Sequence, residues 1–273
     1  MRINRYLAAA GLGSRRSVEA LILEGRVKIN GRPVEDLATA VNPGDVVKVG
    51  SKTVAPQEIV HAVLFKPAGF LCTASDERSR RTIFDLLPTD WPRVYHVGRL
   101  DMESEGLLIV TNDGDLSEAI AHPRNKLEKE YEVVVDKPFD PSHAQKLLRG
   151  FHIEGGRAKM EEVTQVGANK LRVILTQGIK RQIRLMLYDC GYEVESLRRT
   201  RIGTLRIDKL RAGMWRMLSP KDISDLKAAR APKKRGPVST LRPNAPSESP
   251  SQAPIQGAPE KRPQRRVTRP KRA

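Results

Sequence analysis

The segment VGRLDMESEGLLIVTNDG, which spans residues 97–114, joins a loop to a strand and a turn. Its apolar run, Leu107–Val110, is typical of a strand in a protein core, and Asn112-Asp113-Gly114 is typical of a turn. Asp101 precedes the strand in a loop that contains two glycines. A carboxylate on a loop that a buried strand holds can act as a nucleophile or a base. A surface Asp that bonds to its own turn produces the same local pattern.

Strand-like and helix-like runs alternate on both sides of this segment. Strands are predicted at four further places, namely His61–Phe65, Val133–Val135, Leu171–Leu175 and Thr204–Ile207. Helices are predicted at Leu116–Ala121, Pro141–Leu148 and Arg181–Cys190. We therefore expect a mixed sheet with helices on it, in the α+β class.

Residues 1–58 predict a small unit of their own. Ile3, Leu7 and Ala10 recur at near-helical spacing before two glycines break the helix. Ser14 is placed to cap a second helix, which Gly25 ends. Two strands are expected after it, at Val27–Ile29 and Val46–Val49, with a tight turn at Asn30-Gly31.

Basic side chains surround the turn between these two helices. They are Arg2, Arg5, Arg15 and Arg16, with Arg26 and Lys28 just beyond. Two short helices with a basic corner can hold a phosphate backbone.

The composition favours a polyanionic partner. The 273 residues include 49 Lys and Arg against 32 Asp and Glu, which gives a net charge of +17. Each neutralised phosphate releases condensed counterions, so a nucleic acid is the first partner to consider, although a basic surface can also serve solubility alone. No apolar run approaches the ~20 residues of a membrane-spanning helix, and Cys72 and Cys190 lack metal or redox spacing. We expect a protein of the reduced cytoplasm.

The composition changes sharply at the carboxyl end. Residues 231–273 hold nine of the 19 prolines, eleven Lys and Arg, two Glu and no aromatic residue. Such a segment buries too little apolar surface to offset its ordering entropy, so we expect a disordered basic tail. It is typical either of a non-specific RNA-binding arm or of a solvated tail without a role.

Three segments of the first unit carry a family resemblance. Gly13–Arg16, Gly25–Gly31 and Pro43–Val47 together resemble the S-four (alpha-L) RNA-binding domain, which occurs in several classes of RNA-binding protein. The resemblance therefore implies RNA as partner and names no reaction.

The segment at residues 97–114 resembles the catalytic signature of pseudouridine synthases of the RsuA/RluB/RluF family. Further segments at Glu128–Val133, Gln177–Met186 and Leu197–Gly203 resemble the same family in the same order. The resemblance implies a pseudouridine synthase domain, which we place at residues 60–230 between the S-four domain at 1–58 and the tail at 231–273. Within the family, the segments Leu175–Arg184 and Gly191–Ile202 look most like the RluF branch.

The resemblance also implies a catalytic trio. Asp101 takes the place of the family's catalytic carboxylate, which attacks the sugar, attacks the base or removes a sugar proton. Tyr131 takes the place of a tyrosine that stacks on the target uracil; an ordinary core aromatic is the alternative. Arg184 takes the place of an arginine that pairs with the carboxylate through its planar fork; a surface phosphate contact is the alternative.

Two further positions are expected at the substrate. Leu185 is expected to pack against the base, and Arg99 to contact the RNA backbone or the extruded nucleotide. In the same helix, Ile183, Met186, Leu187 and Cys190 are spaced to form the core stripe.

The expected substrate is a uridine in a loop of ribosomal RNA, since leaving the stack costs least there. The RluF likeness and the basic tail favour large-subunit RNA, and small-subunit RNA or a tRNA needs the same chemistry. We expect a monomer without a metal or cofactor, because the base stays bound throughout and the histidines form no ligand cluster. The competing class is a non-catalytic RNA-binding or ribosome-assembly protein.

Overall fold

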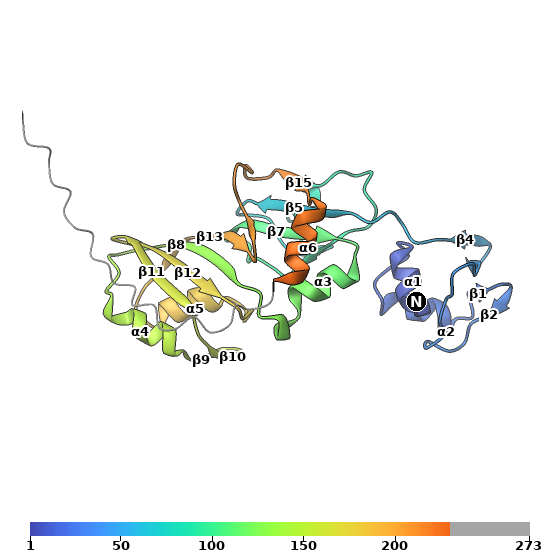
Figure 1. Ribbon diagram of the computed structural model, residues 1–273, viewed down its shortest axis with the longest axis horizontal. Helices are drawn as coiled ribbons and strands as arrows, with labels where there is room; N and C mark the ends of the chain where they lie inside the picture. The colour runs from blue at the N-terminus through green and yellow to red at the C-terminus, as the bar shows by residue number, and fades with distance from the viewer. Residues whose placement is uncertain (230–273) are drawn as a thin grey trace, which may run out of the picture. The chain divides into compact units, whose positions relative to one another are not determined.

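The computed structural model describes residues 1–229 of the chain (Figure 1). The predicted basic tail, residues 231–273, lies outside the described residues.

The first unit consists of two short helices and a small sheet. The helices are α1 (Ile3–Ala9) and α2 (Ser17–Leu23), and the antiparallel sheet has the order β2-β1-β3-β4. Its strands are β1 (Val27–Ile29), β2 (Arg32–Pro33), β3 (Val47–Val49) and β4 (Lys52–Val54). Arg16, and not Ser14 as expected, is at the N-cap position of α2 and makes no side-chain cap bond, because the helix starts only at Ser17; Ser14 lies just before it, and its Oγ accepts the N–H of Ser17 at 3.1 Å. Ile3, Leu7, Val18 and Ile22 are buried together with the valines of the sheet.

A nine-stranded sheet forms the centre of the remaining chain, and its main path has the order β11-β12-β8-β13-β7-β5-β15. The strands are β5 (His61–Lys66), β6 (Tyr95–Val97), β7 (Glu105–Thr111), β8 (Lys129–Val135), β11 (Glu162–Gly167), β12 (Lys170–Leu175), β13 (Val194–Ile202), β14 (Leu205–Arg206) and β15 (Trp215–Met217). The pair β13 and β7 is parallel, whereas β13 and β8 are antiparallel. The expected mixed sheet of the α+β class is thus confirmed.

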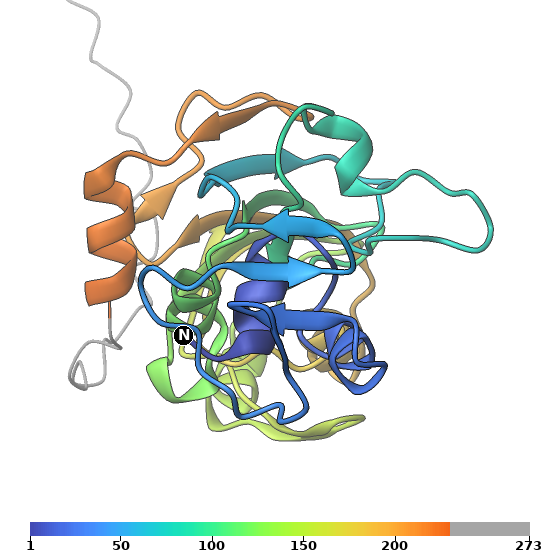
Figure 2. The same cartoon turned by 90° about the vertical axis from the view of Figure 1, so that its right-hand side faces the viewer.

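Helices and short connections cover the sheet. They are α3 (Gly114–Ala121), α4 (Ser142–Arg149), α5 (Gln182–Tyr188), α6 (Pro220–Ala228), the 3-10 turns η1 (Ile83–Leu86) and η2 (Pro123–Asn125), and the hairpin β9 (Phe151–Ile153) with β10 (Gly156–Ala158). Helix α5 buries Ile183, Met186 and Leu187 in the core that β8, β12 and β13 share. Helices α3 and α6 pack side by side over a second core (Figure 1). The loop before η1 extends away from the sheet (Figure 2).

Several predicted boundaries differ from the structure. The helix expected at Arg181–Cys190 is shorter, because Arg181 has a left-handed backbone with φ 55° and precedes the first turn. The strand expected at Thr204–Ile207 is reduced to the two residues of β14. Strand β8 is longer than expected and starts at Lys129, so it includes Tyr131.

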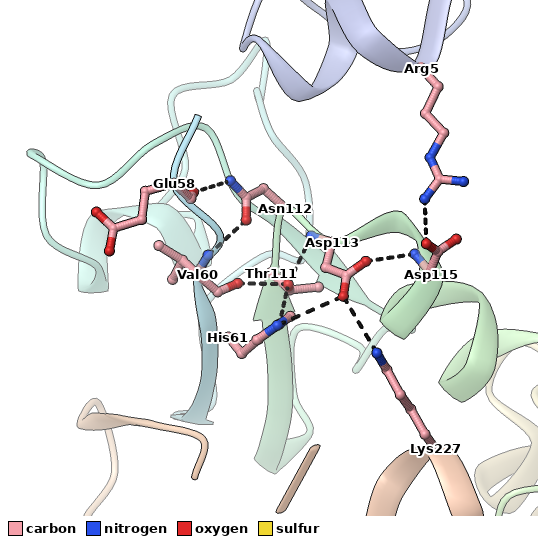
Figure 3. A network of polar contacts seen from close by, with 9 residues as sticks. All are labelled: Arg5, Glu58, Val60, His61, Thr111, Asn112, Asp113, Asp115 and Lys227. Carbon is pink, nitrogen blue, oxygen red and sulfur yellow. Dashed lines mark hydrogen bonds and ion pairs between the residues drawn. The ribbon is translucent and has the colours of Figure 1, made fainter. Parts of the chain in front are cut away.

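A polar network fixes the edge where β5 begins and β7 ends (Figure 3). The amide of Asn112 donates to Glu58 O at 2.8 Å, and its Oδ1 accepts the N–H of Val60 at 2.8 Å. Thr111 Oγ1 donates to Val60 O at 2.6 Å. Asp113 caps α3, since its Oδ1 accepts the N–H of Asp115 at 2.8 Å. The start of β5 is therefore held by side chains of the turn after β7.

Strands β7 and β13 approach closely at one glycine. Gly106 has φ +112°, and a Cβ at this position would stand 2.3 Å from the carbonyl oxygen of Arg199. A side chain at residue 106 is therefore excluded by both backbone conformation and space.

Candidate active site

A cleft of about 850 Å³ opens where the loop before β7 meets β8, β13 and the loop before α5. The residues of the loop that line it include Gly98, Arg99, Leu100 and Asp101. Tyr131 of β8 and Arg199 of β13, which are partners on two adjacent strands, also line it. Two of the three predicted catalytic residues, Asp101 and Tyr131, and the predicted substrate residue Arg99 thus share one cavity.

The loop that carries Asp101 is anchored by a buried lysine. Lys66, at the end of β5, is 0% exposed. Its ammonium group donates to the carbonyl oxygens of Ser104 at 2.7 Å, Pro67 at 3.0 Å, Asp101 at 3.1 Å and Met102 at 3.3 Å. Burial lowers the pKa of Lys66, while nearby acidic groups, among them Asp101, oppose the shift. One side chain therefore fixes both sides of the turn that contains Asp101.

Tyr131 lies in the middle of β8 and is 8% exposed. It belongs to the core that α5 covers and also lines the cleft. Arg199 Cζ lies 6.0 Å from the centre of its ring. Tyr131 is therefore part of the core and also reaches the cleft, so its position is compatible with both alternatives given above.

Arg184 is half-buried on α5 and is not one of the residues that line the cleft. Its Nη1 donates to Val194 O at 2.8 Å, whereas Nε and Nη2 are buried without a hydrogen-bond partner in residues 1–229. Burial lowers the pKa of Arg184, and the charges of Glu103 and Asp101 oppose this shift. The structure contains no ion pair between Arg184 and Asp101 within the described residues, so their pairing stays a prediction. These two unpartnered nitrogens leave Arg184 able to donate hydrogen bonds to a carboxylate.

Leu185 is not among the residues that line the cleft, and its packing against the base stays a prediction. It is half-buried on α5, and the side chain that lines the cleft is its neighbour Ile183.

Comparison with known proteins identifies the family of this fold. Residues 60–189 match the family model of RNA pseudouridylate synthases, and residues 1–47 match the S4 domain. An RNA pseudouridine synthase of Aquifex aeolicus is 40% identical over 83% of this chain and 93% of its own length. The chain belongs to the RNA pseudouridine synthases.

Two other relatives of this synthase have more specific names. The dual-specificity RNA pseudouridine synthase RluF of Escherichia coli K12 is 38% identical, over 83% of this chain and 78% of its own length. The ribosomal large subunit pseudouridine synthase B of Bacillus subtilis is 33% identical, over 83% of this chain and 96% of its own length. The expected RsuA/RluB/RluF membership is therefore confirmed. A crystal structure of a pseudouridylate synthase, 23% identical, has the same fold with a TM-score of 0.61 and covers 83% of this chain and 99% of its own.

Two charged residues that line the synthase cleft were not among the residues predicted for the site. Arg199 is only 2% exposed, and its Nε donates to Leu107 O at 2.7 Å. Its Nη1 donates to Arg99 O at 3.4 Å, on the loop that carries Asp101. Lys129 lines the cleft two residues before Tyr131, and burial lowers its pKa to about 8. The adjacent pair Arg198-Arg199 was a usable signal, because alternation along a strand turns one of two neighbouring side chains inward.

The basic residues of the S4 domain have different surroundings. Arg2, Arg15, Arg16 and Lys28 are exposed, as a phosphate-binding surface requires. Arg5 is instead paired with Asp115 of α3 (Figure 3). The Arg5 guanidinium therefore has a carboxylate partner within the protein, although the sequence suggested a phosphate contact.

The part of the synthase that the structure describes holds no group of three or more His, Cys, Asp or Glu side chains that could bind a metal ion. Among the same residues, none of the helices is both long enough and apolar enough to cross a membrane.

Proposed function

We propose that this synthase isomerises a uridine in large-subunit ribosomal RNA and that Asp101 is its catalytic carboxylate. The observation that carries this proposal is that Asp101 and Tyr131 line the same cleft, with Asp101 on a loop that Lys66 anchors. The relative named for the large ribosomal subunit supports the choice of RNA.

The chemistry requires one oriented carboxylate. The glycosidic bond must break, the uracil must turn while it stays bound, and C5 must bond to the sugar. Asp101 serves this reaction by attacking the sugar, attacking the base or taking a sugar proton. Its loop is held by backbone contacts to Lys66 and Arg199, so the backbone that carries the carboxylate is fixed before substrate binds.

Tyr131 and Arg184 have supporting roles in this proposal. The Tyr131 ring stacks on the uracil, which is worth ~1–3 kcal/mol for a base on an aromatic ring. Arg184 orients Asp101 through its unpartnered Nε and Nη2. Arg99, which is exposed at the cleft, contacts the nucleotide backbone.

The remaining chain contributes RNA binding. Residues 1–58 form the RNA-binding domain and residues 60–230 the catalytic domain, with Arg2, Arg15, Arg16 and Lys28 as phosphate contacts. Residues 231–273 act as a basic arm. We further propose that the synthase works as a monomer in the cytoplasm.

Release of tritium from C5-labelled uridine in ribosomal RNA tests this proposal, since C5 loses its hydrogen when it bonds to the sugar. The expected result is release by the native protein and none by Asp101→Asn, with RNA binding retained by both. Asp90→Asn, a change at an exposed carboxylate, is the matched control. Turnover by Asp101→Asn at the native rate would reject the mechanism. No release by the native protein from any ribosomal RNA or tRNA would favour the competing class, a non-catalytic RNA-binding or assembly protein.

Mapping pseudouridine in cells that lack the protein tests the choice of RNA. The expected result is the loss of one or a few modifications from large-subunit RNA. A loss confined to small-subunit RNA or tRNA would reject that assignment and leave the chemistry unchanged.

A further inference from the structure

Two cations in the cleft have no negative partner. Arg199 is 98% buried, and its Nη2 has no hydrogen-bond partner within residues 1–229. The ammonium of Lys129 donates to one acceptor, Leu127 O at 3.1 Å. Neither side chain forms an ion pair in the described part of the chain. A buried charge without a counterion is costly, so such a pair calls for an anion that arrives later.

The two cations, Lys129 and Arg199, face the same part of the protein, the cleft. Both side chains line the cleft, on the adjacent strands β8 and β13. The pKa of Lys129 is lowered first by burial and then by the positive charge of Arg199. Arg199 also lies beside the Tyr131 ring, on which the uracil stacks in the proposed function. The cations therefore border the position of the base.

The other charged groups of the cleft do not neutralise this pair. Its carboxylates are Asp101 and Glu161, and Glu161 is engaged by Lys159 at 2.9 Å and Thr176 at 2.7 Å. The remaining basic groups of the lining come from loops and are Arg99, His122, Lys126, Lys159, Lys180 and Arg181.

Each route open to Asp101 places a negative charge on the uracil. If the carboxylate attacks C1′ of the sugar, the electron pair of the C1′–N1 bond leaves with N1, and the Asp101 oxygen fills C1′. If Asp101 removes the C2′ proton, the C2′–H pair forms a C1′–C2′ double bond, and the C1′–N1 pair again leaves with the base. If Asp101 adds to C6, the C5–C6 π pair moves toward C4 and its oxygen. In the first two routes the carbonyl oxygens O2 and O4 of uracil share the new charge, and in the third route O4 carries most of it.

We propose that Arg199 and Lys129 form an anion hole that binds the carbonyl oxygens of the uracil and stabilises the charged base during the reaction. The inference rests on the proposed function and adds the group that receives the negative charge. Donors that face the site before the charge develops need no reorganisation when it appears, and one such donor is worth about a hundredfold in kcat.

Lys129 gives the sharper test. Replacing it with arginine keeps a positive charge at the alkaline pH at which the lysine loses its proton. In single-turnover tritium release between pH 6 and pH 10, the native rate is expected to fall above about pH 8, as Lys129 becomes neutral. Lys129→Arg is expected to lose this alkaline limb, and Lys129→Met to be slower by about a hundredfold at pH 7 with an unchanged KM. A merely structural lysine does not produce this pattern.

Lys170→Met and Lys170→Arg are the matched controls. Lys170 is exposed on β12, where it pairs with Glu132 at 3.6 Å, and it does not line the cleft. Both variants are expected to keep the native pH profile. If Lys129→Met retains the native kcat, Lys129 has no catalytic role. If the variant instead raises KM alone and flattens the salt dependence of binding, Lys129 contacts phosphate. Either result rejects the anion hole. Neither result affects the proposed function. That proposal is rejected only if Asp101→Asn turns over at the native rate or if the native protein releases no tritium.

Arg199→Lys provides an independent second test. It keeps a positive charge but loses the guanidinium that holds Leu107 O and Arg99 O. The expected result is a fall in kcat of at least tenfold with KM unchanged, measured where thermal unfolding shows the variant to be folded. Arg198→Lys, an exposed neighbour paired with Glu105 at 2.7 Å, is the control. If folded Arg199→Lys keeps the native kcat, the guanidinium of Arg199 has no role in the anion hole.

Discussion

The buried ammonium group of Lys66 donates a hydrogen bond to the carbonyl oxygen of Asp101 at 3.1 Å. Strand β5 thereby holds the backbone of the residue on which the proposed chemistry depends. The same ammonium binds three other carbonyl oxygens of the loop and of Pro67, so the turn has one common centre.

Replacing Lys66 by Met is therefore expected to remove activity and stability together. Buried carbonyl groups without donors cost about 1–3 kcal/mol each, so we expect a loss of at least about 2 kcal/mol in the free energy of unfolding. Urea unfolding and tritium release measure the two effects. Lys52→Met, at an exposed lysine of β4, is expected to change neither. Native activity in Lys66→Met would show that the loop keeps its shape without this anchor.

Arg184→Met is expected to lower kcat by about a thousandfold and to leave RNA binding intact. The physical reason is that Asp101 would lose the fork that orients it, which is a transition-state contribution and not a binding one. Kinetics at saturating RNA, together with a binding isotherm, measure the split. Arg172→Met, at an exposed arginine on β12, is the control. A variant with weaker binding and native kcat would assign Arg184 to a phosphate contact instead.

Gly106→Ala is expected to destabilise the synthase strongly. Its Cβ would stand 2.3 Å from Arg199 O and 2.6 Å from Arg199 N, so β13 would have to move away from β7. We expect a loss of more than about 2 kcal/mol, measured by urea unfolding. Gly156→Ala separates crowding from backbone strain, because Gly156 has φ +123° and no neighbouring atom within 4 Å. Equal losses in the two variants would mean that strain alone matters.

Asp113→Asn is expected to lower the pKa of His61 further. Burial lowers this pKa below its ordinary value, and the charge of Asp113, whose Oδ2 lies 3.7 Å from His61 Nε2, opposes the shift (Figure 3). Asparagine keeps the helix cap but removes the charge. An NMR titration of the His61 ring protons measures the change, and Asp225→Asn on α6 serves as control.

The same substitution has a consequence for stability. A histidine with a lowered pKa in the folded state binds fewer protons than in the unfolded chain, so stability rises with pH through the window below about pH 6.5. Asp113→Asn should widen that window, and the variant should lose more stability than the native protein between pH 7 and pH 5. Parallel unfolding curves at the two pH values would contradict this assignment.

The sequence predicted those parts of the synthase that depend on local periodicity. Ile183, Met186, Leu187 and Cys190 were expected to form the buried stripe of one helix. The first three do so on α5 because apolar residues repeat at helical spacing, whereas Cys190 lies beyond the end of the helix and is half-buried against the same core. The mixed sheet was expected from alternating strand and helix patterns. The left-handed backbone of Arg181 was not, since a non-glycine residue in this region depends on tertiary contacts.

The candidate site was predictable only in part. Asp101 and Tyr131 were found through the family resemblance and lie in one cleft. Lys66 and Arg199 were missed because a charged residue within or at the end of an apolar strand is usually exposed. Their burial depends on backbone carbonyl groups far away in the sequence, which no local pattern contains.

Asn112 determines where this protein can be recombined with others. Since its side chain binds the backbone of both Glu58 and Val60, the entry to β5 is fixed from the catalytic side, whatever precedes it. A chimaera in which another RNA-reading module replaces the S4 domain should therefore be joined before Glu58. A junction between Glu58 and Val60 would change the backbone path at the two groups that Asn112 binds and so weaken the start of β5.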